Sequence, residues 1–180
     1  MSRSLSFLDK SFWLTESDAN PKHVGCLQKL EAPSGSDTPQ YVKSLYEEMR
    51  GFARACPPFN CRVRAVLGYP LGLQPVKKLS MDYHVQLHRV DNVDDKVAMD
   101  DFVARLHESR LDKNKPLWQY HFIYDEQSNH YAIYARVHHL YGDGTTLVRW
   151  FQAGYLPEQS VAGFTPVWAV KRLRQHGGRG

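Results

Sequence analysis

The stretch Tyr131–Gly144 reads YAIYARVHHLYGDG, and it holds both the clearest strand pattern and the most unusual motif of the chain. Most of its first eight residues are β-branched, aromatic or small, which favours a β-strand that ends at His138. Adjacent side chains of an extended strand point to opposite faces, so His138 and His139 cannot both enter one site while the strand continues. We therefore expect one histidine to be functional and the other structural.

The residues around this stretch predict an α/β fold with a mixed or mostly antiparallel sheet flanked by helices. Asp125–Asn129 is a polar connection of hairpin length, so the runs on either side of it should pair antiparallel. The expected strands are Val24–Leu30, Cys61–Leu67, Tyr83–Val90, Trp118–Tyr124 and Tyr131–His138.

Three helices are expected from apolar residues at three- and four-residue spacing. The first runs from about Pro39 to Ala55, with Thr38 as its cap; the second starts at Asp94-Asp95 and ends near Arg110. The third follows Asp143-Gly144 and places Leu147, Trp150 and Phe151 on one face. Gly68–Ser80 is expected to be a loop.

Composition indicates one globular domain rather than a nucleic-acid-binding protein. The 180 residues carry a net charge of +4. Much of that charge lies in the last ten residues, which leaves the main body close to neutral. We expect a domain over residues 1–156 and a basic, poorly structured tail over residues 157–180.

The cysteines and the apolar pattern predict a cytoplasmic protein. Cys26, Cys56 and Cys61 have no CxxC spacing, and no charged-then-apolar leader opens the chain. No run approaches the ~20 apolar residues of a membrane-spanning helix. Any membrane contact, which the basic tail could favour, should be peripheral.

The adjacent histidines suit proton transfer, because a neutral imidazole is the side chain best poised to accept a proton near pH 7. One other interpretation remains open on the residues alone, and three more are disfavoured because their motifs are missing. His138 and His139 can be ordinary strand-end residues, with Asp143 only the cap of the next helix. A zinc site lacks HExxH and CxxC spacing, and His84 and His88 would lie ~13 Å apart along one strand. Serine-nucleophile and phosphate-loop motifs are absent.

The run His138–Gly144 satisfies the HHxxxDG pattern of the chloramphenicol acetyltransferase-like superfamily. Other segments, in the same order along the chain, make it resemble the wax ester synthase/diacylglycerol acyltransferase family. They are Leu5–Phe12, which is similar to the family opening, Lys22-His23-Val24-Gly25, Asp82-Tyr83-His84-Val85, and the LDxxxPLW-like run Leu111–Trp118.

The resemblance implies roles for individual residues. His139 would be the catalytic base, with His138, Asp143 and Gly144 in supporting roles and Asp143 in a salt bridge to an arginine. Pro116, Leu117 and Trp118 would position the sheet or border the acyl tunnel, although Trp118 is equally suited to the core. Gly142 stands where the family often has an aliphatic residue, which would loosen the loop.

The implied reaction is direct transfer of an acyl group from acyl-CoA to a long-chain alcohol or a diacylglycerol. It requires no metal and no cofactor beyond the acyl-CoA co-substrate. Family members usually have two similar halves, and only the first is expected here. The partners would then include a second acyltransferase half or another copy of the chain, and a membrane or lipid-droplet surface, but no nucleic acid.

Two further classes of function follow as alternatives. A truncated homologue would bind acyl chains or a partner through an exposed apolar surface without catalysing transfer. A relative that serves peptide or polyketide synthesis would take its acyl group from a carrier protein, and activity with free acyl-CoA would argue against that.

Overall fold

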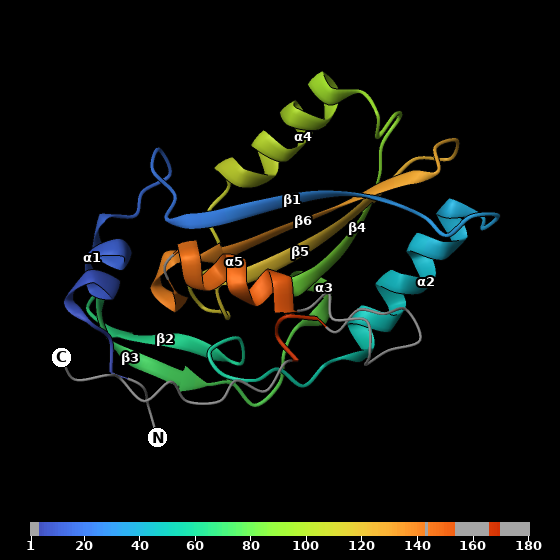
Figure 1. The fold of residues 1–180 in the computed structure, drawn as a ribbon. Coiled ribbons are helices and arrows are strands. Elements are labelled where there is room, and N and C mark those ends of the chain that lie inside the picture. The colour runs from blue at the N-terminus through green and yellow to red at the C-terminus, as the bar shows by residue number, and fades with distance from the viewer. Residues whose placement is uncertain (1–3, 143, 154–165, 170–180) are drawn as a thin grey trace.

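The centre of the protein is a mixed four-stranded sheet in the order β1-β6-β5-β4, as the computed structural model shows for residues 4–142, 144–153 and 166–169 (Figure 1). β6 is antiparallel to both of its neighbours, whereas β4 is parallel to β5. The expected hairpin is confirmed, with Trp118 opposite Val137 in the register. The strands are β1 (His23–Glu31), β4 (Val85–Arg89), β5 (Trp118–Tyr124) and β6 (His130–His138).

The three expected helices are present, and the described residues form two further helices. Asp37, not Thr38, caps the first expected helix, since its carboxylate accepts the Gln40 N–H at 2.9 Å. That helix ends at Gly51, before the expected Ala55, where glycine lowers helix propensity. The helices are α1 (Phe7–Thr15), α2 (Thr38–Gly51), α3 (Met81–His84), α4 (Lys96–Glu108) and α5 (Gly144–Ala153).

The two faces of the central sheet bury different apolar sets. Because side chains alternate along β5, Phe122 faces the larger core with α2, and Ile123 faces the smaller core beneath α4. Figure 1 shows α4 on one side of the sheet and α2 and α5 on the other. All residues of β5 are buried, as expected of a strand covered on both faces.

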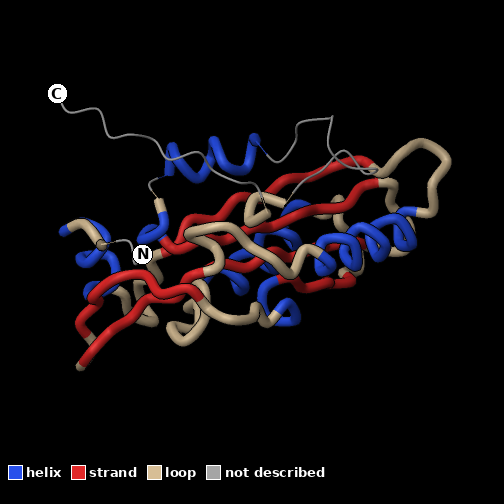
Figure 2. Tube along the Cα trace, turned by 90° about the horizontal axis from the view of Figure 1, so that it is seen from below, coloured by secondary structure: helices blue, strands red, loops and turns tan. Residues whose placement is uncertain are grey.

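A second, two-stranded sheet joins the expected strand at Cys61–Leu67 to a segment that was expected to be a loop. β2 (Cys61–Val66) pairs antiparallel with β3 (Tyr69–Pro75), so the loop prediction for Gly68–Ser80 is wrong over β3. Its prolines and glycines weaken the strand pattern, but Leu73 is buried in the core and keeps the strand in place. Figure 2 shows this hairpin extending at one end of the molecule.

The segment expected as one strand from Tyr83 begins instead with the short helix α3. His84 is its last residue, and the ring lies 4.2 Å from the Trp118 ring in a stacked arrangement. The prediction that His84 and His88 share a strand face is therefore wrong. Packing on Trp118 outweighs the β propensity of Tyr83 and His84 here.

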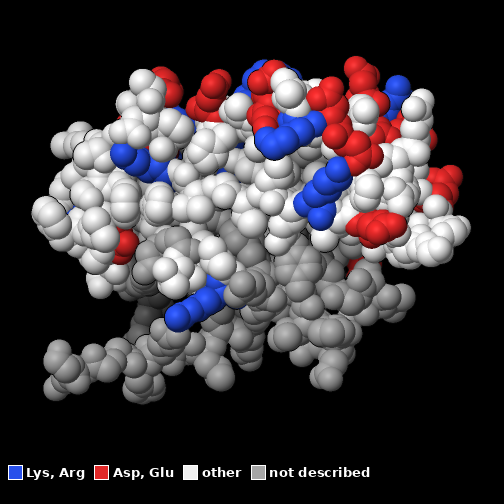
Figure 3. All heavy atoms as spheres, turned by 45° about the horizontal axis from the view of Figure 1, so that its top comes forward, with Lys and Arg blue, Asp and Glu red and all other residues white. Residues whose placement is uncertain are grey.

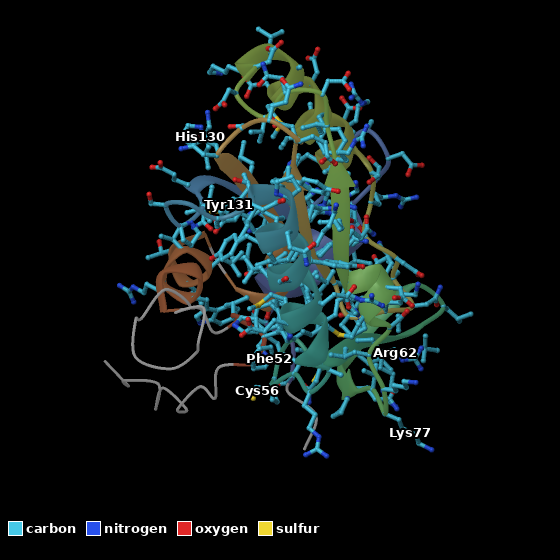
Figure 4. The ribbon with its side chains drawn as sticks, turned by 90° about the vertical axis from the view of Figure 1, so that its right-hand side faces the viewer. Phe52, Cys56, Arg62, Lys77, His130 and Tyr131 are labelled. Atoms are coloured by element: carbon cyan, nitrogen blue, oxygen red, sulfur yellow. The ribbon has the colours of Figure 1, made fainter. Side chains whose placement is uncertain are left out.

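Four residues of the expected C-terminal tail pack into the core. Trp168 is fully buried, and its indole N–H donates to the Phe52 carbonyl at 3.0 Å. The Cys56 N–H donates to the Trp168 carbonyl at 2.7 Å. Phe52 and Cys56 lie close together after α2 (Figure 4). The boundary at residue 156 stays a prediction, because most of the tail lies outside the described residues.

The surface around α4 carries both signs of charge. Figure 3 shows acidic and basic side chains intermingled there. They form pairs such as Lys96 with Asp100 and Lys29 with Asp94. Among the described helices, none is long and apolar enough to cross a membrane.

Candidate functional site

The two adjacent histidines lie where β6 ends, and they have different environments. His138 is the last residue of β6 and is fully buried. His139 is half-buried and begins a 3₁₀ turn, η1 (His139–Tyr141). The His139 N–H donates to the Lys22 carbonyl at 2.9 Å, next to the start of β1. Of the pair, His139 is therefore the more exposed histidine.

His138 is a neutral residue that holds the turn. Burial, together with the charge of Lys113 and the neighbouring His139, lowers the pKa of His138 to about 3. Its Nδ1 accepts the Leu140 N–H at 3.0 Å, which caps η1. This arrangement agrees with the expectation that one histidine is structural.

The imidazole of His139 stacks on Phe12 of α1. The ring centroids are 4.8 Å apart and the planes are inclined by 19°. The sequence predicted neither α1 nor this contact. The available signal was the Ser6-to-Asp9 spacing of a capping box, which the structure contains at the start of α1.

The rest of the HHxxxDG motif is described in part. Asp143 lies outside the described residues, so the expected salt bridge to an arginine does too. Gly144 begins α5, as expected. Gly142 has an extended backbone with φ near −179°, and an added Cβ would lie 3.1 Å from the Thr146 methyl group. Lack of space, and not a special dihedral angle, favours glycine there.

Pro116, Leu117 and Trp118 are buried and lie behind the histidines. The Leu117 carbonyl accepts the His138 N–H at 3.0 Å, and the Leu117 N–H donates to the Tyr141 hydroxyl at 2.9 Å. The Trp118 indole donates to the Phe59 carbonyl at 2.8 Å. These contacts fit the core alternative for Trp118, while a substrate-binding role for the three residues stays a prediction.

The other motifs that carried the resemblance converge on the same region. His23 pairs with His138 across β1 and β6. The Tyr83 hydroxyl accepts the Asp112 N–H at 2.8 Å. Segments far apart in the sequence thus form one scaffold around the end of β6.

A buried carboxylate that the sequence analysis missed completes this scaffold. Glu16 follows α1, and one of its oxygens lies 3.6 Å from His138 Nε2. Its other oxygen lies 3.0 Å from Lys113 Nζ. Among the described residues, no group of three or more histidine, cysteine or acidic side chains could hold a metal ion.

The fold resembles part of a peptide-synthetase condensation domain. The first condensation domain of the calcium-dependent antibiotic synthetase superposes with a TM-score of 0.61 at 15% identity, covering 87% of this chain and 37% of that one. At such low identity the likeness shows the fold alone.

Residues 5–176 match the family model described as the wax ester synthase/diacylglycerol acyltransferase catalytic domain. The chain therefore belongs to this family. The wax ester synthase/diacylglycerol acyltransferase from Marinobacter aquaeolei VT8 superposes with a TM-score of 0.81 at 27% identity, covering 98% of this chain and 42% of that one.

The curated relatives are longer proteins. Two from Mycobacterium tuberculosis (strain CDC 1551 / Oshkosh), provisionally assigned as diacylglycerol O-acyltransferases, are 29% and 31% identical over 144 and 147 residues. The matches cover 79% and 80% of this chain but 32% and 29% of the relatives. The chain thus spans about a third of the length of the curated relatives it matches.

Proposed function

We propose that this chain contributes the general base of an acyl-CoA-dependent O-acyltransferase, and that His139 is that base. The observation that carries the proposal is the difference between the two histidines. His138 is fully buried and its ring accepts a hydrogen bond from the turn, whereas His139 is half-buried at the end of the strand. Supporting roles for His138 and Gly144 follow from their places in the turn and the next helix, and we assign Asp143 a supporting role from the motif.

In the proposed reaction His139 accepts the hydroxyl proton while the alcohol oxygen attacks the thioester carbonyl of acyl-CoA. The C–S bond then breaks, and the coenzyme A thiolate takes the proton back from the imidazolium. The products are an ester and free coenzyme A, with no covalent acyl-enzyme. A positioned base of this kind contributes roughly 10²–10⁴ in rate.

The acceptor in this proposal is a long-chain alcohol or a diacylglycerol, which gives a wax ester or a triacylglycerol. Membership of the family supports this choice. Because the relatives are about three times as long, we propose that a second acyltransferase half or another copy of the chain completes the site. A cytoplasmic location with peripheral contact to a membrane or lipid droplet belongs to the same proposal.

The direct test is release of free coenzyme A from palmitoyl-CoA, with hexadecanol or a diacylglycerol as acceptor. We expect acceptor-dependent release to fall roughly 10²–10⁴-fold in His139→Ala. His130→Ala is the matched control, because His130 lies at the opposite end of the same strand (Figure 4). It should keep its rate within about twofold, since it lies far from the reacting groups. Equal loss in both variants would contradict the assignment of His139.

A binding module without activity is the second candidate. It is favoured by exposed apolar side chains on α1 and on the β2–β3 hairpin, which are Phe7, Leu8, Leu14, Val66, Leu67, Tyr69 and Leu71. This candidate predicts no coenzyme A release from a folded chain, and a gel-filtration mass above that of the monomer. Turnover by the chain would exclude it.

A further inference from the structure

Glu16 is a carboxylate in a buried position, where a charged side chain is unusual. Only 1% of its side chain is exposed, and acidic side chains are seldom so buried unless they are paired. Lys113 supplies the opposite charge, with Nζ at 3.0 Å from Oε2. Lys113 is itself held by the Trp13 carbonyl at 3.3 Å and lies over the Trp13 ring. The pairing accounts for one carboxylate oxygen of Glu16.

The second carboxylate oxygen faces the ring of His138. Oε1 lies 3.6 Å from His138 Nε2, and the Lys22 N–H lies 3.5 Å from the same oxygen. His138 Nδ1 accepts the Leu140 N–H, so that nitrogen carries no proton. The single proton of the neutral ring is then on Nε2, the nitrogen that faces Glu16.

The same side of α1 also contacts the second histidine. Phe12 and Glu16 are four residues apart, so they lie on one side of the end of α1. Phe12 stacks on the ring of His139, and Glu16 faces the ring of His138. Consecutive histidines on β6 and η1 thus rest against residues one turn apart.

From this arrangement we infer that Glu16 is a positioning residue for His139. Glu16 acts on His139 indirectly, through His138. By favouring the proton on His138 Nε2, Glu16 leaves Nδ1 available to the Leu140 N–H, and that bond starts the turn on which His139 lies. The catalytic meaning of this inference rests on the proposed function. The tautomer of His138 does not, because it follows from the contacts alone.

NMR measurement of the histidine ring nitrogens tests the inference without any activity. In the wild-type chain His138 should carry its proton on Nε2. In Glu16→Ala we expect a mixture of tautomers, a shifted Leu140 amide signal and at least tenfold faster exchange of that amide. A role limited to the ion pair with Lys113 predicts an unchanged tautomer, and that result would overturn the inference.

Asp125→Ala is the matched control, because Asp125 is also a buried carboxylate and its oxygens accept the N–H groups of Val93, Gln127 and Ser128. It should destabilise the chain and leave the His138 tautomer unchanged. Glu16→Gln retains an acceptor oxygen, and we expect it to keep the Nε2–H form. If Glu16→Ala does not fold, Glu16→Met carries the same test. Loss of the Nε2–H form in that variant supports the inference, and an unchanged tautomer overturns it. Absence of the Nε2–H form in the wild type also overturns it.

Activity gives an independent reading. We expect kcat to fall at least tenfold in Glu16→Ala, with KM for acyl-CoA within about twofold, and Glu16→Gln to recover most of the rate. An altered tautomer with unchanged kcat would overturn the positioning role. An inactive wild-type chain would count against the proposed function, while the NMR result would still decide how Glu16 acts on His138.

Discussion

Tyr141 anchors the η1 turn, on which His139 lies, to the protein interior. Its side chain is buried, and its hydroxyl donates to the Cys61 carbonyl and accepts the Leu117 N–H. Tyr141→Phe removes both bonds and leaves a buried N–H and a buried carbonyl without partners. We expect the free energy of unfolding to fall by about 1–3 kcal/mol, measured by urea denaturation.

Tyr69→Phe provides the comparison for that measurement. The Tyr69 hydroxyl lies at the surface and accepts only a long hydrogen bond, 3.4 Å, from Lys10 Nζ among the described contacts. Its loss should change the free energy of unfolding by less than about 0.5 kcal/mol. Equal effects of the two substitutions would show that the Tyr141 bonds contribute nothing specific.

Gly25 belongs to one of the motifs behind the family resemblance, and the structure gives a packing reason for it. A Cβ at this position would lie 2.6 Å from the Tyr134 hydroxyl and 2.8 Å from a carbon of the same ring. Tyr134 is buried and hydrogen-bonded to His107 Nδ1, so it cannot move away without losing that bond.

Gly25→Ala should therefore destabilise the protein by about 1–3 kcal/mol. Gly51→Ala is the control, because nothing lies within 4 Å of its Cβ position and it is the last residue of α2. It should be neutral or slightly stabilising, since alanine is the better helix former. Thermal unfolding followed by circular dichroism measures both, and a stable Gly25→Ala would contradict the packing argument.

At the level of elements, the turn between β2 and β3 contains a strained residue. Leu67 has a φ of 48° and Gly68 a φ of 81°, which are the signs of a type I′ turn. Glycine and asparagine adopt the backbone conformation of the first position readily, whereas the Cβ of leucine makes it sterically unfavourable. The Leu67 side chain is fully exposed, so no core contact compensates for that cost.

Leu67→Asn should accordingly raise the free energy of unfolding by about 0.5–1 kcal/mol. Val66→Asn, at the neighbouring exposed position in β2, is the control and should be destabilising because asparagine is a poor strand former. Urea denaturation of the two variants distinguishes them. A destabilised Leu67→Asn would mean that the leucine makes a contact that its full exposure does not reveal.

The same hairpin shows what the sequence could and could not predict. The strand Trp118–Tyr124, which is rich in aromatic residues, was predicted with its exact bounds. β3 was missed because Pro70, Gly72 and Pro75 break the pattern, and its pairing with β2 supplies what propensity does not. α1 was missed because it is only nine residues long and its apolar residues are spread around the helix, so no amphipathic stripe marks it in the sequence.

For the candidate site, the motif predicted the histidines but not what surrounds them. The location of His138 and His139 at a strand end followed from strand propensity alone. Their contacts with Phe12 and Glu16 join segments more than a hundred residues apart. Such contacts depend on tertiary packing, which no local pattern encodes.

Across the whole molecule, buried histidines link stability to pH. Burial lowers the pKa of His23 and His84 to about 4, and that of His121 and His138 to about 3. Neighbours that are charged or can be protonated add to this effect. They are His107 and Arg136 for His23, Lys115 for His84, His88 and Arg136 for His121, and Lys113 and His139 for His138. All four histidines are therefore neutral in the folded protein at pH 6–8.

The sign of the pH effect follows from the depressed pKa values. Below pH 6.5 these histidines bind protons in the unfolded chain but not in the folded protein. The free energy of unfolding therefore decreases as the pH falls towards 4. Each group contributes a slope of about 1.4 kcal/mol per pH unit at most. We expect the free energy of unfolding to be flat from pH 7 to 8 and to fall by several kcal/mol between pH 6.5 and 4.5.

Urea denaturation at half-unit pH steps measures this slope, and His121→Phe identifies one contributor. His121 lies on the α4 side of the sheet, 3.0 Å from His88 and stacked on Tyr134, so phenylalanine preserves its volume and its ring contact. Between pH 6 and 5 the free energy of unfolding of this variant should depend less steeply on pH, by an amount that corresponds to about one proton. His130→Phe, which replaces a partly exposed histidine instead of a buried one, is the matched control. An unchanged slope in His121→Phe would mean that His121 titrates alike in the folded and unfolded chains, contrary to its burial between the sheet and α4.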